Sequence, residues 1–356
     1  MLIATVVGNR PQFVKAAAVS RKLRAIAEEV LIHTGQHYDD ELSRIFFDEL
    51  GIPAPDRQLD IHGGSNTEQS ARMLAAVAPL FEELGPDLVL VYGDTNSTLA
   101  AALAAAQLRI PLAHVEAGMR SFDRGMPEEL NRVLADHASD LLFCSTQTAV
   151  DNLAAENVRE GVHLVGDVMA DVALAFLPVA EERSSALVDN GVTEGDYVLM
   201  TVHRPGNVDA PERLERVVEL AERVPCDAVF PVHPRTRARM RAAGLEERLR
   251  AAVKVTQPLG YLDFLKLAAH ARALMTDSGG VQKEAYLLGT PCITLRDTTE
   301  WVETVELGWN VLVDLDVDAA ISALRRPLPD RERPELYGGG HAADRICQVL
   351  AAYTGR

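Results

Sequence analysis

The sequence predicts an α/β protein made of two doubly wound domains, each with a parallel sheet covered by helices. Short apolar segments alternate with helical stretches from one end of the chain to the other, and the alternation is interrupted once and then restarts. Short strands spaced by helices are typical of parallel sheets wrapped by helices. With 356 residues, of which 47% are hydrophobic, the chain can form two separate cores.

Strands are expected where short runs of apolar residues occur. These runs are Leu2–Val7, Val30–His33, Leu88–Tyr92, Pro111–Val115, Leu141–Cys144, Tyr197–Val202, Ala228–Val232, Ala273–Thr276 and Cys292–Leu295. Helices are expected between them, including Pro11–Ala27, Thr95–Gln107, Pro211–Arg223 and Gly279–Leu288, and one terminal helix covers 341–353. Parallel folds of this kind bind ligands at the carboxyl ends of their strands, where the polar clusters of this chain fall.

The domain boundary is expected near residues 168–190. The segment 166–193 has weak strand content and includes a charged patch of small residues, Glu181–Ser185. The sequence therefore predicts an N-terminal domain over 1–168 and a C-terminal domain over 190–338. The remaining residues, 339–356, are expected to form a helix that packs back across the domains.

Composition excludes several classes of protein. The formal charge of −17 disfavours a surface for nucleic acid or anionic membrane. No apolar run approaches the roughly 18 residues of a membrane span. The first residues read as a strand and lack the basic segment and cleavage site of a signal peptide, so a cytoplasmic protein is expected. No histidine pair has metal-ligand spacing, and neither GxGxxG nor a P-loop is present.

The segment 114–132 carries the densest mixture of charges in the chain. Its acidic residues Glu116, Asp123, Glu128 and Glu129 stand among Arg120, Arg124 and Arg132, with His114 at its head. Carboxylates beside arginines, placed just after a strand, suit acid–base chemistry on an anionic substrate. The alternative is a solvated charged loop.

A glycine turn at residues 276–285 predicts an anion site. The strand Ala273–Thr276 is followed by Asp277 or Ser278 as a cap, by Gly279 and Gly280, and by a helix. This places free N–H groups and the positive helix end where a phosphate can bind, and Glu284 about one turn further on suits ribose hydroxyls. The alternative is an ordinary capped turn.

Four further strand ends carry candidate groups. Arg10 and Lys15 flank the start of a helix after the first strand, where they can direct cations at a diphosphate or lie on the surface. Asp94 follows Leu88–Tyr92 as a crevice carboxylate or as a helix N-cap. His203 and His233 end strands in the second half, as site residues or as ordinary polar residues.

Six motifs, in this order, closely resemble the non-hydrolysing UDP-N-acetylglucosamine 2-epimerases: GNRPQFVKAA, TGQHYDDELSRIFF, VYGDTNSTLAAALAA, HVEAGMRSFDRGMPEELNR, TVHRPGNVD and DSGGVQKEAYLLGTPCITLRDTTEWVE. The resemblance runs from residue 2 to about residue 315. It implies two Rossmann-like domains in the glycosyltransferase-B architecture with an active site in the interdomain cleft. It also implies a homodimer that needs neither metal nor nicotinamide, and a role in cell-surface polysaccharide biosynthesis.

The resemblance also implies roles for individual residues. Asp94, Glu116 and Glu128 match the acid–base carboxylates, and His203 matches the histidine at the leaving group. Arg10 and Lys15 match cationic contacts, Ser278, Gly279 and Gly280 the phosphate turn, and Glu284 the ribose contact. His233, Phe264, Arg120 and Arg132 are added as expected substrate contacts, and Asp123 and Glu129 are expected to hold the arginines and the helix start.

The implied reaction interconverts UDP-N-acetylglucosamine and UDP-N-acetylmannosamine by elimination of UDP and its re-addition. The alternatives are a hydrolysing relative that releases UDP and N-acetylmannosamine, a 2-epimerase of a 2,3-diacetamido uronic acid sugar, a glycosyltransferase and a silent UDP-sugar sensor. Three departures from the family pattern bear on this choice. Gly206 stands where family members with the HRxEN pattern have Glu, and Lys283 stands where many members have a second Glu. Gln36–Asp39 replaces the QHRQ of members that are activated by their own substrate. The usual second, activating substrate site is therefore not expected in the same form.

Overall fold

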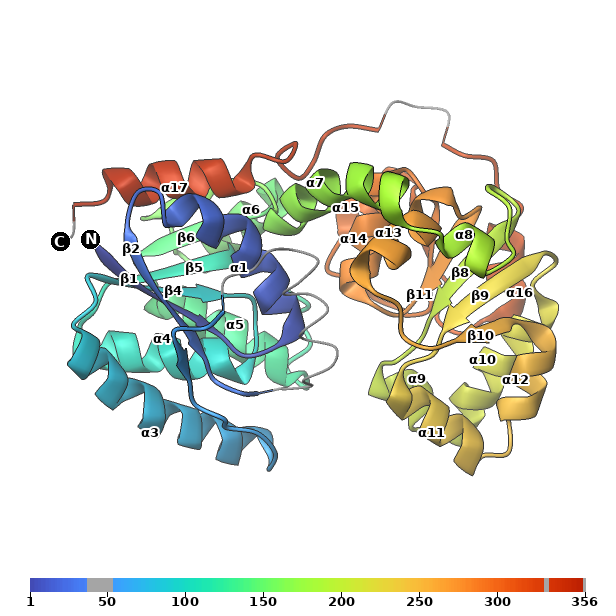
Figure 1. Ribbon diagram of the computed structural model, residues 1–356, viewed down its shortest axis with the longest axis horizontal. Helices are drawn as coiled ribbons and strands as arrows, with labels where there is room; N and C mark the ends of the chain where they lie inside the picture. The colour runs from blue at the N-terminus through green and yellow to red at the C-terminus, as the bar shows by residue number, and fades with distance from the viewer. Residues whose placement is uncertain (37–53, 330–332, 355–356) are drawn as a thin grey trace. The chain divides into compact units, whose positions relative to one another are not determined.

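Figure 1 shows the computed structural model of the chain, which describes residues 1–36, 54–329 and 333–354 apart from the side chain of Arg10. The chain forms two compact units. Unit 1 comprises Met1–Val172 and Glu335–Arg356, and unit 2 comprises Ala173–Pro334. The division falls within helix α7 (Val168–Arg183), so the segment that separates the two strand–helix runs is helical.

Unit 1 contains a parallel sheet with the strand order β3-β2-β1-β4-β5-β6-β7. Its strands are β1 (Leu2–Val7), β2 (Glu28–His33), β3 (Arg57–Gln58), β4 (Leu88–Tyr92), β5 (Leu112–Ala117), β6 (Leu141–Cys144) and β7 (Val162–Leu164). Its helices are α1 (Arg10–Leu23), α3 (Asn66–Leu84), α4 (Asn96–Leu108), α5 (Pro127–Ala138), α6 (Gln147–Ala155), the start of α7 and α17 (Ala342–Ala352).

Unit 2 contains a second parallel sheet with the order β10-β9-β8-β11-β12-β13. Its strands are β8 (Tyr197–Thr201), β9 (Asp227–Pro231), β10 (Lys254–Thr256), β11 (Ala273–Thr276), β12 (Cys292–Thr294) and β13 (Asn310–Leu312). Its longer helices are α10 (Pro211–Arg223), α11 (Pro234–Ala242), α13 (Tyr261–His270) and α14 (Gly279–Leu288). Shorter ones are α8 (Ala186–Asp189), α9 (Pro205–Val208), α12 (Glu246–Ala252), α15 (Val302–Glu306) and α16 (Val317–Ala323).

Both sheets are wound in the same way, and this places the candidate residues. The chain starts near the middle of each sheet, builds outward to one edge, and then crosses back to build the other half. The strand order therefore reverses between β1 and β4 in unit 1 and between β8 and β11 in unit 2. Ligands of doubly wound sheets bind at such switch points, beside the carboxyl ends of the strands.

Helices cover both faces of the unit 1 sheet. On one face, α1 and α17 pack together on the sheet through buried side chains such as Phe13, Val19, Ile346 and Leu350. On the other face, α3 and α4 bury Val77, Phe81 and a run of small alanines of α4. The terminal helix thus completes the core of unit 1, although it follows unit 2 in the sequence.

Local sequence signals set the helix starts. Ser65 and Glu68 form a capping box at the start of α3, and Gly85 ends this helix in the left-handed conformation. Asn9 caps α1 ahead of Pro11. The strands β3, β7, β10 and β13 were not expected, because each has only two or three residues and no extended apolar run.

Across the described ranges, no helix combines the length and apolar character that crossing a membrane requires.

Candidate active site

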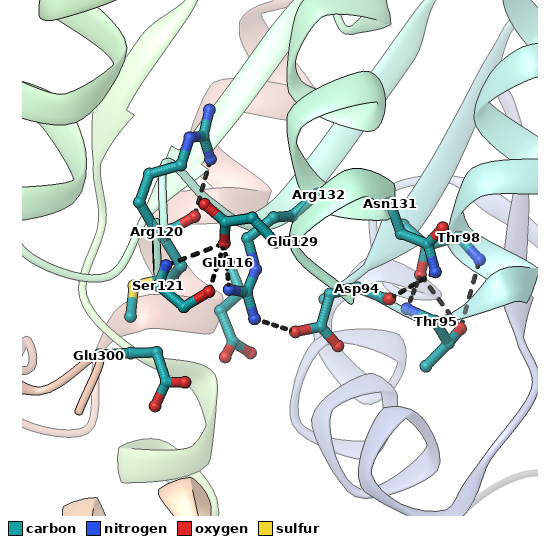
Figure 2. Close-up of polar contacts among 12 residues, drawn as sticks. Asp94, Thr95, Thr98, Glu116, Arg120, Ser121, Glu129, Asn131, Arg132 and Glu300 are labelled. Carbon is teal, nitrogen blue, oxygen red and sulfur yellow. Dashed lines mark hydrogen bonds and ion pairs between the residues drawn. The ribbon is translucent and has the colours of Figure 1, made fainter. Parts of the chain in front are cut away.

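Unit 1 gathers charged side chains at the carboxyl ends of β4 and β5 (Figure 2). The Lys15 ammonium pairs with the Glu116 carboxylate. Arg132 of α5 reaches Asp94 with one guanidinium nitrogen and Glu129 with another, the latter at 2.8 Å. The structure therefore brings together the predicted residues Lys15, Asp94, Glu116 and Arg132.

Asp94 is not the cap of the helix that follows it. Helix α4 begins at Asn96, and its N-cap is Thr95, which exchanges hydrogen bonds with Thr98 in a capping box. The Asp94 carboxylate is therefore available to Arg132, and its carbonyl accepts a 3.0 Å hydrogen bond from Asn131. Of the two interpretations of Asp94, this geometry favours the crevice carboxylate.

Glu116 lies in an unusual backbone conformation. The pairing of β5 with β6 shifts by one residue between Val115 and Ala117, which is a β-bulge, and Glu116 has a φ of 73°. A non-glycine residue in this left-handed region costs about 1–3 kcal/mol and is concentrated at functional sites. The bulge turns the Glu116 side chain away from the strict alternation of the strand.

The buried charges stabilise one another. Burial by itself lowers the pKa of Lys15, but Glu116 and Asp94 outweigh this effect and raise the pKa above its ordinary value. Burial also lowers the pKa of Arg132, and Asp94 and Glu129 more than reverse it. For Glu129 the penalty of burial is overcome by hydrogen bonds from Ser121 and the charge of Arg132, so its pKa is lowered. Lys15, Glu129 and Arg132 are therefore charged at neutral pH.

Other predicted residues of unit 1 lie elsewhere. Glu128 is exposed in the first turn of α5, outside this buried cluster. Asp123 accepts a hydrogen bond from the Gly125 N–H, whereas Glu129 does hold Arg132 as expected. The Arg10 side chain and residues 37–39 lie outside the described part of the chain.

Arg120, an expected substrate contact, has its guanidinium bound within unit 1. The residue is only 5% exposed. Nη1 binds Asp136 at 2.7 Å and the Met119 carbonyl, while Nε and Nη2 bind Glu156 at 2.7 and 2.9 Å. Arg120 therefore holds the loop after β5 in place.

Unit 2 places His203 and His233 side by side after β8 and β9. Their ring centroids are 6.2 Å apart, and the His233 ring caps α11 by accepting a hydrogen bond from the Arg235 N–H. His203 Nδ1 lies 3.2 Å from the Asp277 carboxylate at the end of β11. The two histidines therefore belong to one cluster at the switch point of the second sheet.

Asp277 organises this cluster, a role that differs from the helix cap considered for it. Its buried carboxylate accepts hydrogen bonds from the N–H groups of His203 and Arg204 and from Asn207 Nδ2, at 3.0–3.1 Å. Burial raises the pKa of Asp277, but His203 and these donors outweigh it and lower the pKa. The position of Asp277 at a strand end beside the glycine turn was the only sequence signal for this role.

The glycine turn has the form that an anion site requires. Ser278 caps α14, and Gly279 and Gly280 are its first two residues, so their N–H groups lie at the positive helix end. A Cβ on Gly279 would lie 3.5 Å from Glu300 and from the Trp301 indole nitrogen. Glu284 is buried in the same helix.

Two other side chains of unit 2 bear on helix α14. Lys283 is buried, with its ammonium 4.4 Å from the centre of the Trp301 ring. Phe264 of α13 is half-buried and packs on the core cluster that includes Ala285 of α14, so it supports the helix.

Among the described residues, no three His, Cys, Asp or Glu side chains are grouped so as to hold a metal ion.

Two parallel sheets of the same winding, each with polar side chains at its switch point, define the glycosyltransferase-B class of architecture, as predicted. The family model described as UDP-N-acetylglucosamine 2-epimerase matches residues 21–351. The chain belongs to this UDP-N-acetylglucosamine 2-epimerase family, which confirms the resemblance carried by its motifs.

Individual relatives match along almost their whole length. A protein of Methanococcus maripaludis described as a UDP-N-acetylglucosamine 2-epimerase homolog is 47% identical, with 98% of this chain and 99% of that protein covered. The UDP-2,3-diacetamido-2,3-dideoxy-D-glucuronate 2-epimerase of Pseudomonas aeruginosa is 46% identical, with 99% of each covered. The crystal structure of the Methanocaldococcus jannaschii UDP-GlcNAc 2-epimerase with UDP-GlcNAc and UDP is 40% identical, covers 99% of this chain and 100% of that one, and has a TM-score of 0.91.

Proposed function

We propose that the chain is a non-hydrolysing epimerase that interconverts UDP-N-acetylglucosamine and UDP-N-acetylmannosamine. The observation that carries this proposal is the cluster of Asp94 and Glu116 with Lys15 and Arg132 at neighbouring strand ends. Inversion at C2 requires one group that removes a proton from one face and another that returns a proton to the opposite face. Two carboxylates from adjacent strands suit this task, with Glu128 as a third candidate.

The proposed reaction proceeds in two balanced steps. A carboxylate takes the C2 proton while the C1–O bond breaks, which releases UDP and leaves a C1–C2 double bond in a 2-acetamidoglucal. A second carboxylic acid then protonates the other face of C2, and a UDP oxygen forms a new bond to C1. Because the C2 hydrogen is weakly acidic, stabilisation of the departing diphosphate must assist its removal.

Unit 2 supplies the nucleotide-binding groups in this proposal. The N–H groups at the start of α14, from Ser278 to Gly280, bind diphosphate oxygens, and Glu284 binds the ribose. His203, held by Asp277, assists the leaving group, and His233 and Phe264 complete the nucleotide contacts. Arg10 and Lys15 add cations from unit 1, by the resemblance to the family.

A modified substrate is the second candidate. The relative from Pseudomonas aeruginosa, 46% identical, is described as acting on a UDP-diacetamido-glucuronate. Lys283 adds a buried cation in α14 where many family members carry Glu, and a uronate substrate brings an additional carboxylate.

We also infer that the protein is a cytoplasmic homodimer that needs neither metal nor nicotinamide and serves cell-surface polysaccharide synthesis. Sedimentation velocity tests the dimer.

Incubation with UDP-N-acetylglucosamine, followed by 31P and 1H NMR, tests this proposal. The expected result is UDP-N-acetylmannosamine with both diphosphate resonances retained. Accumulation of free UDP and N-acetylmannosamine would assign the hydrolysing reaction instead. If UDP-N-acetylglucosamine is unchanged and the UDP-diacetamido-glucuronate is epimerised in a parallel sample, the modified sugar is the substrate.

A further inference from the structure

His114 is a fully buried histidine of β5 whose two ring nitrogens both lie close to oxygen atoms. Nδ1 is 2.7 Å from Asp136 Oδ1, and Nε2 is 2.7 Å from the Gly93 carbonyl oxygen. Both distances are in the range of short hydrogen bonds. The ring thus connects α5, which carries Asp136, to the turn directly before Asp94.

Both partners of the ring can only accept. The Gly93 carbonyl has no proton to donate, and the Asp136 carboxylate also accepts hydrogen bonds from the Arg120 guanidinium at 2.7 Å and from the Gly118 N–H at 3.0 Å. Both nitrogens of His114 therefore face acceptor oxygens, and we infer that both donate.

The contact to Gly93 holds Asp94 in place. The Gly93 N–H donates to the Val115 carbonyl at 2.9 Å, and the Gly93 carbonyl accepts from His114. Both polar groups of this residue are therefore fixed by β5. Asp94 follows directly, and its own carbonyl is held by Asn131.

The same group of contacts holds Glu116. The bulge that contains Glu116 lies between His114 and Gly118, and both of these residues bind the Asp136 carboxylate. Asp136 thus ties the two ends of the bulge together and keeps Glu116 at its positive φ of 73°. Arg120 binds Asp136 from the other side and is itself held by Glu156.

We propose that His114 is a positioning residue for the epimerisation, because its doubly donating ring fixes the carboxylates of Asp94 and Glu116 relative to each other. This role rests on the proposed function, in which these two groups transfer the proton at C2. His114 does not touch the substrate in this proposal. Loss of the His114 ring should therefore affect the chemical step much more than nucleotide binding, which is assigned mainly to unit 2.

Three variants test this role. In His114→Asn the shorter amide can reach Asp136 but not Gly93, and kcat is expected to fall about 100-fold, the cost of a misplacement of roughly 1 Å. KM and the calorimetric Kd for UDP are expected to stay within about threefold. In His114→Gln the longer amide can donate to Gly93, so kcat should recover to within about tenfold of the native value. His163→Asn, on β7 of the same sheet, is the matched control and should behave as the native protein.

The protonation of the ring is tested on the native protein. In a sample with 15N-labelled histidine, the His114 ring is expected to show two N–H protons at neutral pH. The proposal would be overturned if His114→Asn kept the kcat of the native protein, or if it lost as much UDP affinity as kcat. A single N–H on the native His114 ring would overturn it as well. If the native protein does not epimerise any UDP sugar, the proposed function fails instead, and the NMR result alone judges the ring.

Discussion

Replacing Glu116 by glutamine is expected to lower exchange of the C2 hydrogen of UDP-N-acetylglucosamine by about 10³-fold and to leave UDP binding intact. The amide keeps the size of the side chain but can neither remove nor deliver the proton, and acid–base groups contribute about 10² to 10⁴ in rate. UDP binding should persist because the glycine turn that we propose binds the diphosphate belongs to unit 2. Both tryptophans of the chain, Trp301 and Trp309, lie in unit 2, so their fluorescence reports nucleotide binding.

The matched control for this change is Asp123→Asn. Asp123 lies on the same loop but is exposed and accepts only a local hydrogen bond from Gly125. Its variant should exchange the C2 hydrogen at the native rate. Retention of exchange in Glu116→Gln, or loss of UDP binding with it, would show that the role of Glu116 is assigned wrongly.

Replacing Asp277 by alanine is expected to destabilise unit 2 by about 3 kcal/mol at neutral pH, because this removes one partner from a buried group of hydrogen bonds and charge. The N–H groups of His203 and Arg204 would lose their acceptor, and so would Asn207 Nδ2. Unfolding of unit 2 can be followed in urea by tryptophan fluorescence. Asp318→Ala is the control, since the Asp318 carboxylate is exposed and pairs with Arg223 at the surface. Its loss should cost less than about 1 kcal/mol.

The contribution of Asp277 to the stability of unit 2 should also depend on pH. Its folded-state pKa is lowered below the ordinary value of 3.8, so its contribution to stability is fully present well above that value. The contribution is lost as the pH falls through the folded-state pKa. The difference in unfolding free energy between native protein and Asp277→Ala should therefore shrink as the pH falls from about 5 through 3.8 and below. An unchanged difference at low pH would mean that the carboxylate charge does not stabilise unit 2.

Much of the fold follows from local patterns. Apolar runs such as Leu88–Tyr92 and Ala273–Thr276 mark central strands because these are buried on both faces. The edge and peripheral strands β3, β7, β10 and β13 escape such a search, since pairing with a neighbour rather than composition defines them. Helix starts with capping residues can also be predicted from the sequence, as Ser278 ahead of α14 illustrates.

The sequence indicated the residues of the candidate site but not the partners that each of them binds. The strand-end rule identified Asp94, Glu116 and His203, and the structure places each at a switch-point strand or its neighbour. Which partner each residue takes depends on contacts between residues far apart in the chain. For example, the sequence suggested Arg120 as a substrate contact and did not reveal that its guanidinium binds Asp136 and Glu156. The bulge at Glu116 likewise has no signature in the sequence.

In the proposed reaction the chain transfers a proton at C2 while the nucleotide departs and returns. Incubation with UDP-N-acetylglucosamine in D2O, followed by 1H NMR and mass spectrometry, tests it most directly. The predicted result is one deuterium at C2 in the epimerised product, with the nucleotide still attached to the sugar. Epimerised product that retains its original C2 hydrogen, or the absence of C2 exchange with both UDP-N-acetylglucosamine and the UDP-diacetamido-glucuronate, would contradict it.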